Sequence, residues 1–289
     1  MPYRTDPDVA GVTGRKGAPC YRAAVDATLN APPAARTEPP ATGTLEARWL
    51  GRIDYRAAWQ LQKRLVAARS DDRIGDQLLL LEHPAVLTLG RTSDPAHILA
   101  SESVLAARGI EVVHVERGGE VTYHGPGQLV AYPIIALSRR GLLLRPLVRA
   151  LEDALVETCA ALGVAADRRD GHPGCWVDPD GVAPRKIGAL GLRIERGVSY
   201  HGIALNVSVD LADFDLIDPC GMPGVVSTSI AAERGLADPP TTASVAEAAH
   251  WFGPALARRL GAELAGRLPP ADPAATLDEL EQLAGPTER

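Results

Sequence analysis

The chain has few aromatic residues and very few lysines. Only two Phe occur among 289 residues, so the core must be built from Leu, Val, Ile and Ala, and the apolar content of 46% is sufficient for that. Lysine occurs only at positions 16, 63 and 186, among many arginines. Arg keeps its proton in proteins, whereas a Lys can be tuned by its surroundings. Lys16 lies in an expected tail and Lys63 on an expected helix exterior, which leaves Lys186 as the lysine that needs another explanation.

Other features that the chain lacks exclude whole classes of protein. No apolar run approaches 18 residues, so we expect no membrane span. The first residues contain no apolar segment of the secretory type, so we expect a cytoplasmic protein. A formal net charge of −6 argues against general nucleic-acid binding. The four cysteines form no CxxC pair, which is typical of free thiols in a reducing compartment; they are Cys20, Cys159, Cys175 and Cys220.

Nucleotide and metal motifs are also missing. The chain has no GxGxxG after a first strand and no P-loop. His172 and Cys175 have HxxC spacing, and other histidines adjoin Gly or Pro, but no second pair of ligands completes a site. We therefore expect neither a metal nor a cofactor.

The pattern along the chain predicts one catalytic domain over 45–267. Residues 1–44 are rich in Ala, Pro and Thr without apolar periodicity, which indicates a disordered extension. Residues 268–289 indicate a loose tail with a short helix over 276–284. Strands grouped between helices favour an α+β domain, with helices covering one face of a mostly antiparallel sheet.

The individual elements follow from periodicity and from Gly and Pro signals. Helices are expected after a cap at Asp54, over 101–108, over 146–162 and over 242–265, the last with a kink at Pro254. The helix over 146–162 would bury Cys159 on its apolar face, so we interpret Cys159 as a core thiol. Strands are expected over 45–50, 77–82, 85–89, 111–115, 128–136, 175–177, 187–195 and 200–209.

Residues 117–128, RGGEVTYHGPGQ, form the most informative segment. Five of these twelve positions are Gly or Pro, yet apolar, strand-like residues flank the segment on both sides. Glycine lets a ligand approach the main chain closely, and Arg117, Tyr123, His124 and Gln128 supply polar groups. The composition indicates one wall of a small-molecule pocket, and the alternative is a solvent-exposed loop.

Cys220 is the candidate nucleophile. It lies in IDPCGMPGVVSTS, where Gly and Pro surround it, unlike a core cysteine in a periodic run. A free thiol is only about 3% thiolate at neutral pH, and a nearby cation raises that fraction tenfold or more. Lys186, in RKIGALG, is the candidate cation. The alternative is a structural cysteine in a turn.

Four segments in this order resemble the lipoyl (octanoyl) transferases of lipoate biosynthesis. They are LLLEHPAVLTLGR at 79–91, RGGEVTYHGPGQLVAYPI at 117–134, KIGALGLRIERGVSYHGIALNV at 186–207 and DPCGMPGVVSTS at 218–229. The resemblance covers roughly 45–260. It implies the fold of the biotin and lipoate protein ligases, with a mixed, mostly antiparallel sheet and packed helices.

The resemblance also implies an activity, partners and site residues. The activity is transfer of an octanoyl group from octanoyl-acyl carrier protein to a lysine of lipoyl domains, in 2-oxoacid dehydrogenase complexes and in the glycine cleavage H protein. Cys220 matches the acyl-accepting nucleophile, and Lys186 matches the residue that lowers its pKa. The matching substrate-binding residues are Arg117, Gly118, Gly119, Glu120, Val121, Thr122, Tyr123, His124, Ala189, Leu190, Gly191, Gly202, Ile203 and Ala204.

Some features depart from this pattern or leave alternatives open. GHPGCWV at 171–177 differs from the usual run of the family and adds Cys175, which we interpret as a packing residue, with an off-site oxidation partner as the alternative. The runner-up function is an ATP-dependent lipoate protein ligase, and a third is a non-catalytic acyl sensor on the same fold. An acidic carrier requires a local basic patch on this acidic chain. Our candidate is Arg139, Arg140, Arg145 and Arg149, with an ordinary solvated helix face as the alternative.

Overall fold

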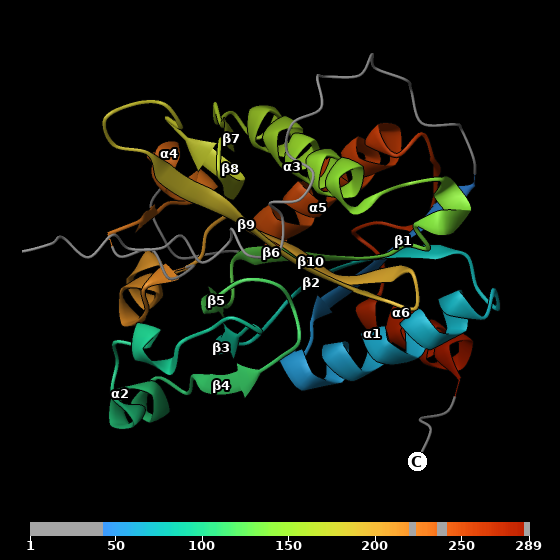
Figure 1. Ribbon diagram of the computed structural model, residues 1–289, viewed down its shortest axis with the longest axis horizontal. Helices are drawn as coiled ribbons and strands as arrows, with labels where there is room; N and C mark the ends of the chain where they lie inside the picture. Colours follow the sequence, from blue (N-terminus) through green and yellow to red (C-terminus); the bar gives the residue numbers. More distant parts are fainter. Residues whose placement is uncertain (1–42, 220–223, 236–241, 286–289) are drawn as a thin grey trace, which may run out of the picture. The chain divides into compact units, whose positions relative to one another are not determined.

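The computed structural model describes residues 43–219, 224–235 and 242–285. Residues 1–42, and with them the disorder expected for 1–44, lie outside this part of the chain. The described part is built on one large mixed sheet with a smaller sheet beside it (Figure 1).

The large sheet has nine strands in the order β12-β1-β2-β6-β10-β9-β8-β7, with β11 paired to β9. Pairs β1–β12, β1–β2 and β11–β9 are parallel, and the other pairs are antiparallel. The strands are β1 (Thr44–Arg52), β2 (Asp76–Glu82), β6 (Gln128–Ile134), β7 (Asp167–Arg169), β8 (His172–Val177), β9 (Arg185–Glu195), β10 (Val198–Asn206), β11 (Val226–Ser227) and β12 (Glu263–Arg267). The small sheet contains β3 (Val86–Leu89), β4 (Glu111–His114) and β5 (Thr122–His124) in the order β4-β3-β5.

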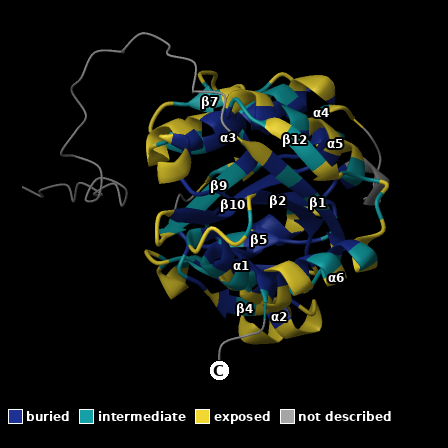
Figure 2. Cartoon of the chain, turned by 90° about the vertical axis from the view of Figure 1, so that its right-hand side faces the viewer, coloured by how far each residue is buried: buried dark blue, intermediate teal, exposed yellow. Residues whose placement is uncertain are grey.

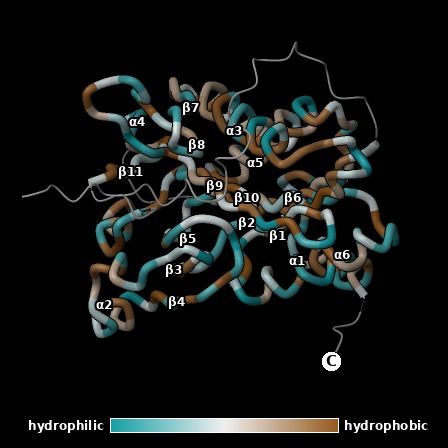
Figure 3. The backbone as a smooth tube through the Cα atoms, viewed as in Figure 1, coloured by the Kyte–Doolittle hydropathy of each residue, from teal (hydrophilic) through white to brown (hydrophobic). Residues whose placement is uncertain are grey.

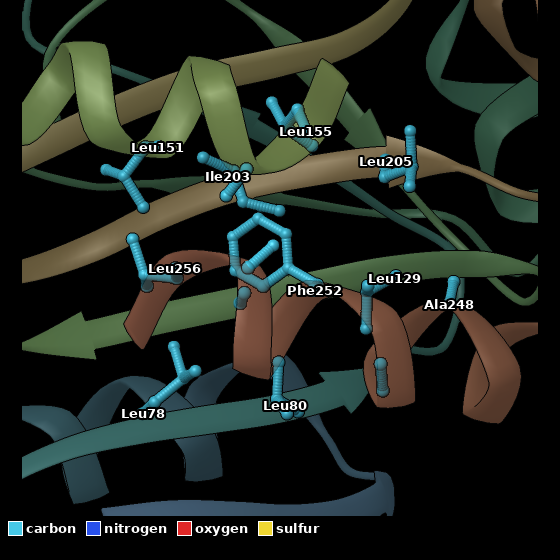
Figure 4. Packing of buried hydrophobic residues seen from close by; sticks show 14 of the residues in the cluster. Leu78, Leu80, Leu129, Leu151, Leu155, Ile203, Leu205, Ala248, Phe252 and Leu256 are labelled. Carbon is cyan, nitrogen blue, oxygen red and sulfur yellow. The ribbon is translucent and has the colours of Figure 1, made fainter. Parts of the chain in front are cut away.

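Helices cover both faces of the large sheet. On one face α3 (Leu144–Ala161) and α5 (Thr242–Arg259) bury the main core cluster, part of which Figure 4 shows around Phe252. On the other face α1 (Tyr55–Ser70) and α6 (Pro273–Ala284) pack over Leu79, Val130 and Tyr200. The expectation that helices cover one face was therefore wrong. Because both faces are covered, every residue of β2 and β10 is buried, and such strands show no polar alternation (Figures 2 and 3).

The helix starts follow from local chemistry. Asp54 accepts a hydrogen bond from the Ala57 backbone N–H at 2.9 Å and caps α1, as predicted. Ser101 caps α2 (Glu102–Ala107), which ends before Gly109 at φ +65°. The remaining helical segments are α4 (Ile230–Glu233) and the 3-10 turns η2 (Pro95–His97), η3 (Ser138–Arg140) and η4 (Leu211–Leu216).

The C-terminal part of the chain differs from the prediction. Helix α5 ends at Arg259, and β12 occupies residues expected to be helical, because Gly261 at φ +60° turns the chain back to pair with β1. The loose tail expected over 268–289 contains α6, which begins before the predicted short helix. Leu280 and Ala284 of α6 are buried against α1, so this segment belongs to the core.

The middle of the large sheet contains an interruption. Pro133 of β6 has no N–H for the ladder, and His201, beside it on β10, takes a left-handed φ of +54°. Its own N–H donates to Oε1 of Gln62 at 2.8 Å. A Cβ on the next residue, Gly202, would lie 2.0 Å from the Ala131 carbonyl oxygen. The two strands therefore approach so closely that only glycine can occupy position 202.

We predict that Gly202→Ala lowers the free energy of unfolding by about 2 kcal/mol or more, because the added methyl group collides with main chain that cannot move aside. Gly75→Ala is the matched control, since a Cβ there meets nothing within 4 Å, and it should change stability by no more than about 0.5 kcal/mol. Urea denaturation of both variants measures the difference. Equal stabilities would contradict the close approach.

Candidate active site

The Gly-rich segment 117–128 lies directly on the main chain of β9. The Gly118 N–H donates to the Leu192 carbonyl at 2.9 Å, and a Cβ on Gly191 would lie 2.9 Å from the Gly118 oxygen. A Cβ on Gly90 would lie 2.2 Å from the Gly119 oxygen. Val121, in the same segment, is fully buried. The alternative of a solvent-exposed loop is wrong, and the segment instead forms a wall against β9.

The other two predicted binding segments, 189–191 and 202–204, lie side by side on neighbouring strands. In the β9–β10 ladder, Ala189 pairs with Ala204, Leu190 with Ile203, and Gly191 with Gly202. Because Gly191 also touches Gly118, all three segments meet at one place. The sequence analysis did not show that residues 189–191 and 202–204 pair with each other across two strands.

Arg117 and Tyr123 hold this wall in place. The Arg117 guanidinium is buried and donates to the Thr88 carbonyl at 2.6 Å and to its hydroxyl at 2.8 Å, which ties the segment to β3. The Tyr123 hydroxyl donates to Asp213 Oδ2 at 2.6 Å, and Arg108 donates to the other oxygen. Burial, together with its bond to Asp213, raises the pKa of Tyr123 far above its usual value.

Lys186 lies at a small cavity of about 20 Å³ where several candidate residues meet. Lys186 is on β9 and nearly buried. The cavity is lined by Thr122, Gln128, Lys186, Gly188, Ala189, Asn206, Phe214, Pro219 and Ser227. Cys220 itself lies outside the described residues. Its preceding neighbour, Pro219, lines the cavity, and downstream Ser227 pairs with Lys186 in the β11–β9 ladder.

A larger cavity, of about 550 Å³, adjoins the first and shares Phe214, Pro219 and Ser227 with it. Its other walls come from η4 and from the residues that precede β11. The described parts of the chain on either side of 220–223 are both anchored. The Asp218 N–H donates to the His97 carbonyl at 2.8 Å, and the Thr228 N–H donates to the Lys186 carbonyl at 2.9 Å.

A chain of buried hydrogen bonds links the Gly-rich segment to Thr228, the residue after β11. Gln128 donates through Nε2 to Asn206 Oδ1 at 2.9 Å, and Asn206 donates to the Thr228 carbonyl at 2.9 Å. The Oε1 atom of Gln128 must then accept, so His124 donates to it from Nδ1 at 2.7 Å. Burial lowers the pKa of His124 to about 3, and the ring is therefore neutral at pH 7.

Sequence reasoning missed a buried group of rings next to His124. It consists of Tyr55, His83, Tyr132 and His201. His83 donates from Nδ1 to the Ile53 carbonyl at 2.7 Å and accepts from the Tyr132 hydroxyl at 2.8 Å. Neither ring nitrogen of His201 has a hydrogen-bond partner within the described part of the chain. Tyr55 lies in α1, His83 directly after β2, Tyr132 in β6 and His201 in β10. In the sequence, only the positions of His83 before a Pro and of His201 before a Gly pointed to two of them.

The other candidate positions have simple structural explanations. Cys159 and Cys175 are fully buried in the main core cluster with their sulfurs 4.0 Å apart, so the predicted burial of Cys159 is confirmed. Of the four arginines of the expected basic patch, Arg140 is buried and paired with Asp76, whereas Arg139, Arg145 and Arg149 are exposed. Among the described helices, none combines the length and the apolar character that a membrane crossing requires.

The buried histidines make stability depend on pH. Burial lowers the pKa of His83 to about 4 and that of His201 to about 3, as it does for His124. In the unfolded chain each histidine titrates near 6.5, so below that pH the unfolded state binds more protons than the folded one. The unfolding free energy is therefore highest above about pH 6.5, where the histidines are neutral in both states, and it decreases as the pH falls below that value.

We predict that lowering the pH from 7 to 5 costs about 2 kcal/mol of unfolding free energy for each of these three histidines. His201→Asn should remove about one third of that dependence, because Asn tolerates the left-handed backbone but does not titrate. His114→Gln is the control, since His114 is exposed. Urea denaturation at both pH values measures the effect, and a pH-independent stability would contradict it.

Comparisons with known proteins agree with this geometry. The family of the lipoyl protein ligase A/B catalytic domain matches residues 54–250. An octanoyltransferase of Chloroflexus aurantiacus is 51% identical over 205 residues, which cover 71% of this chain and 90% of that protein. An octanoyltransferase of Aromatoleum aromaticum is 46% identical over 219 residues, with 76% and 88% covered.

Solved structures support the predicted fold. A lipoate-protein ligase A bound with ATP superposes with a TM-score of 0.55 at 15% identity, over 82% of this chain and 93% of that one. A putative lipoate protein ligase of T. acidophilum gives the same score at 15% identity, over 81% and 93%. The predicted α+β fold with a mixed sheet and packed helices is thus confirmed. The chain belongs to the lipoyl protein ligase A/B catalytic domain family, and within it resembles the octanoyltransferases.

Proposed function

We propose that this protein is an octanoyltransferase that moves an octanoyl group from octanoyl-acyl carrier protein to a lysine of lipoyl domains, through a thioester on Cys220. The acceptors would be lipoyl domains of 2-oxoacid dehydrogenase complexes and of the glycine cleavage H protein. High identity to octanoyltransferases supports the activity. The observation that carries the site is one cavity lined by Lys186, by Thr122 and Ala189 from two of the binding segments, and by Pro219, the residue before Cys220.

The chemistry follows from the properties of a thioester. The Cys220 thiolate attacks the octanoyl carbonyl, the bond to the carrier sulfur breaks, and the carrier leaves as a thiolate that takes up a proton from solvent. The acceptor lysine then attacks the new thioester as a free amine, an amide forms, and the Cys220 thiolate leaves. Since the donor is already activated, the transfer needs no ATP, and the two steps give ping-pong kinetics.

Lys186 would act on the sulfur and on the proton. Its ammonium group stabilises the Cys220 thiolate as a nearby opposite charge. In the second step it relays the proton that the acceptor amine loses. Backbone N–H groups of the Gly-rich segments would stabilise the negative oxygen that forms during each attack.

The pocket would recognise the acyl chain by burying it. An octanoyl chain has six methylenes, whose burial contributes about 5 kcal/mol at about 0.8 kcal/mol each. Discrimination between neighbouring chain lengths should be modest, about 1–3 kcal/mol per methylene. The substrate-binding roles of Arg117 to His124, Ala189 to Gly191 and Gly202 to Ala204 are part of this proposal. Contact between these three segments supports it.

The same fold also occurs in a lipoate-protein ligase bound with ATP, so a ligase is the competing function. A ligase would form an acyl-adenylate and would not need Cys220. A non-catalytic acyl sensor would need neither Cys220 nor Lys186 as a reactive pair. The three functions differ in what happens to the acyl group. A transferase carries it on Cys220, a ligase carries it as an acyl-adenylate, and a sensor binds it without transfer.

We predict that wild-type protein mixed with octanoyl-acyl carrier protein gains the mass of one octanoyl group, and that Cys220→Ser abolishes both this gain and transfer to a lipoyl domain. Intact-mass spectrometry measures both. Cys175→Ser is the matched control, because this buried thiol lies outside the proposed chemistry. Transfer by Cys220→Ser that requires ATP would establish the ligase instead, and no mass gain on the wild type would favour the sensor.

We predict that Lys186→Met lowers the rate at which iodoacetamide alkylates Cys220 at pH 7 by about tenfold or more, because the thiolate loses its cation. The measurement uses a Cys20→Ser background, in which the other thiols, Cys159 and Cys175, are buried. Lys63→Met, on the exposed side of α1, is the control and should leave the rate unchanged. Equal alkylation rates for Lys186→Met and the wild type would remove Lys186 from this role.

A further inference from the structure

The ammonium group of Lys186 lies over an aromatic ring. Its Nζ is 5.2 Å from the centroid of the Trp176 ring, within the range of a cation–π interaction. Trp176 on β8 and Lys186 on β9 are partners in the antiparallel ladder. Trp176 is fully buried and Lys186 nearly so, and exclusion of water strengthens the attraction.

We propose that Trp176 is a positioning residue, whose indole face holds the Lys186 ammonium at the acyl-transfer site. This inference rests on the proposed function for the role of Lys186 in catalysis. A ring face attracts a cation without bearing a net charge. The positive charge of the ammonium held there attracts an anionic group such as a thiolate.

The Trp176 ring is itself fixed in position. Its Nε1–H donates to the His172 carbonyl at 3.0 Å, within the same strand. Its neighbours Cys175 and Val177 both belong to the core under α3 and α5. Because successive side chains of a strand point to opposite faces, Trp176 is directed away from that core. The ring therefore presents a fixed face.

Gly174 lets the lysine side chain reach the ring. A Cβ on Gly174 would lie 3.1 Å from Cε of Lys186 and 2.4 Å from the Gly188 oxygen. The aliphatic stem of Lys186 thus crosses β8 at a residue without a side chain. The Gly174 N–H donates to Glu152 Oε1 at 3.1 Å, which ties this crossing to α3. Gly174 makes room for the stem, and Trp176, two residues further along the strand, receives the ammonium.

A second cation near the same ring provides a control. The Arg169 guanidinium carbon is also 5.2 Å from the Trp176 ring centroid. His172 lies edge-on to the ring, and its pKa is lowered by desolvation and then by the positive charges of Arg169 and Lys186. Replacing Arg169 changes the charge around the ring but leaves the contact between Lys186 and Trp176 in place.

The contact can be tested directly by NMR, because the chain has only three lysines. In protein labelled with ¹³C at the lysine ε-carbon, Lys186→Arg identifies the Lys186 signal by its loss. We expect this signal to show a ring-current shift that Trp176→Leu abolishes and Trp176→Phe partly keeps. Lys63 is an internal reference, since its Nζ lies 3.9 Å from the Trp59 ring centroid and should not respond to changes at Trp176. An unchanged Lys186 signal in Trp176→Leu would overturn the proposal.

The functional effect is measured on the first half-reaction, as the single-turnover rate of octanoyl gain by intact mass. We expect Trp176→Leu to lower this rate about tenfold or more, Trp176→Phe to recover part of it, and Arg169→Gln to retain it. If Trp176→Phe is acylated no faster than Trp176→Leu although both variants are equally stable, the ring face has no role. Should the wild type gain no octanoyl group, the proposed function fails, while the NMR result still decides the contact between Trp176 and Lys186.

Loss of packing in the leucine variant is separated from loss of the ring face by fluorination. Fluorotryptophans placed at position 176 by nonsense suppression keep the shape of the ring and withdraw electron density from its face. We expect the acylation rate to fall progressively from tryptophan to monofluoro- and trifluorotryptophan, with the unfolding midpoint unchanged. A rate independent of fluorination would overturn the proposal.

Discussion

The site depends on main chains that touch where side chains are absent. Gly118 lies on Gly191, Gly119 on Gly90, and Gly202 on the carbonyl of Ala131. A Cβ on Gly191, Gly90 or Gly202 would lie 2.9 Å or less from the main-chain oxygen that it faces, so a methyl group at any of these three positions would push the two main chains apart. The contact between Gly118 and Gly191 joins the Gly-rich segment to β9, and the ladder between β9 and β10 adds the third binding segment.

Anchors around these contacts keep the polar groups in fixed positions. Arg117 is bound to Thr88 and Tyr123 to Asp213, so two residues that looked like ligand-binding side chains also serve as ties between elements. The histidines next to them are kept neutral by burial, which lowers the pKa of His124 to about 3. Lys186, in contrast, is placed with its charge against the face of Trp176. The region therefore combines neutral polar rings with a cation at the cavity that Pro219 also lines.

The core explains why this arrangement is rigid. The large sheet is covered by α3 and α5 on one side and by α1 and α6 on the other, so its central strands are buried on both faces. Helix α6, which the composition of the C-terminal segment did not lead us to expect in the core, places Leu280 against α1. A short Ala- and Leu-containing helix flanked by prolines has the composition of a tail, and its burial is decided by a groove that the rest of the fold provides.

The sequence by itself determined the candidate residues and most elements. Asp54 and Ser101 stand where helices begin, Gly109 where one ends, and Lys186 is unusual because the chain is so poor in lysine. These are local signals, set by backbone geometry and by the chemistry of single residues. The pairing of Gly191 with Gly202, the ring cluster around His83 and the contact between Lys186 and Trp176 were decided only by the tertiary structure. Such contacts depend on strand register and on how layers stack, and neither is encoded in the spacing of residues along one segment.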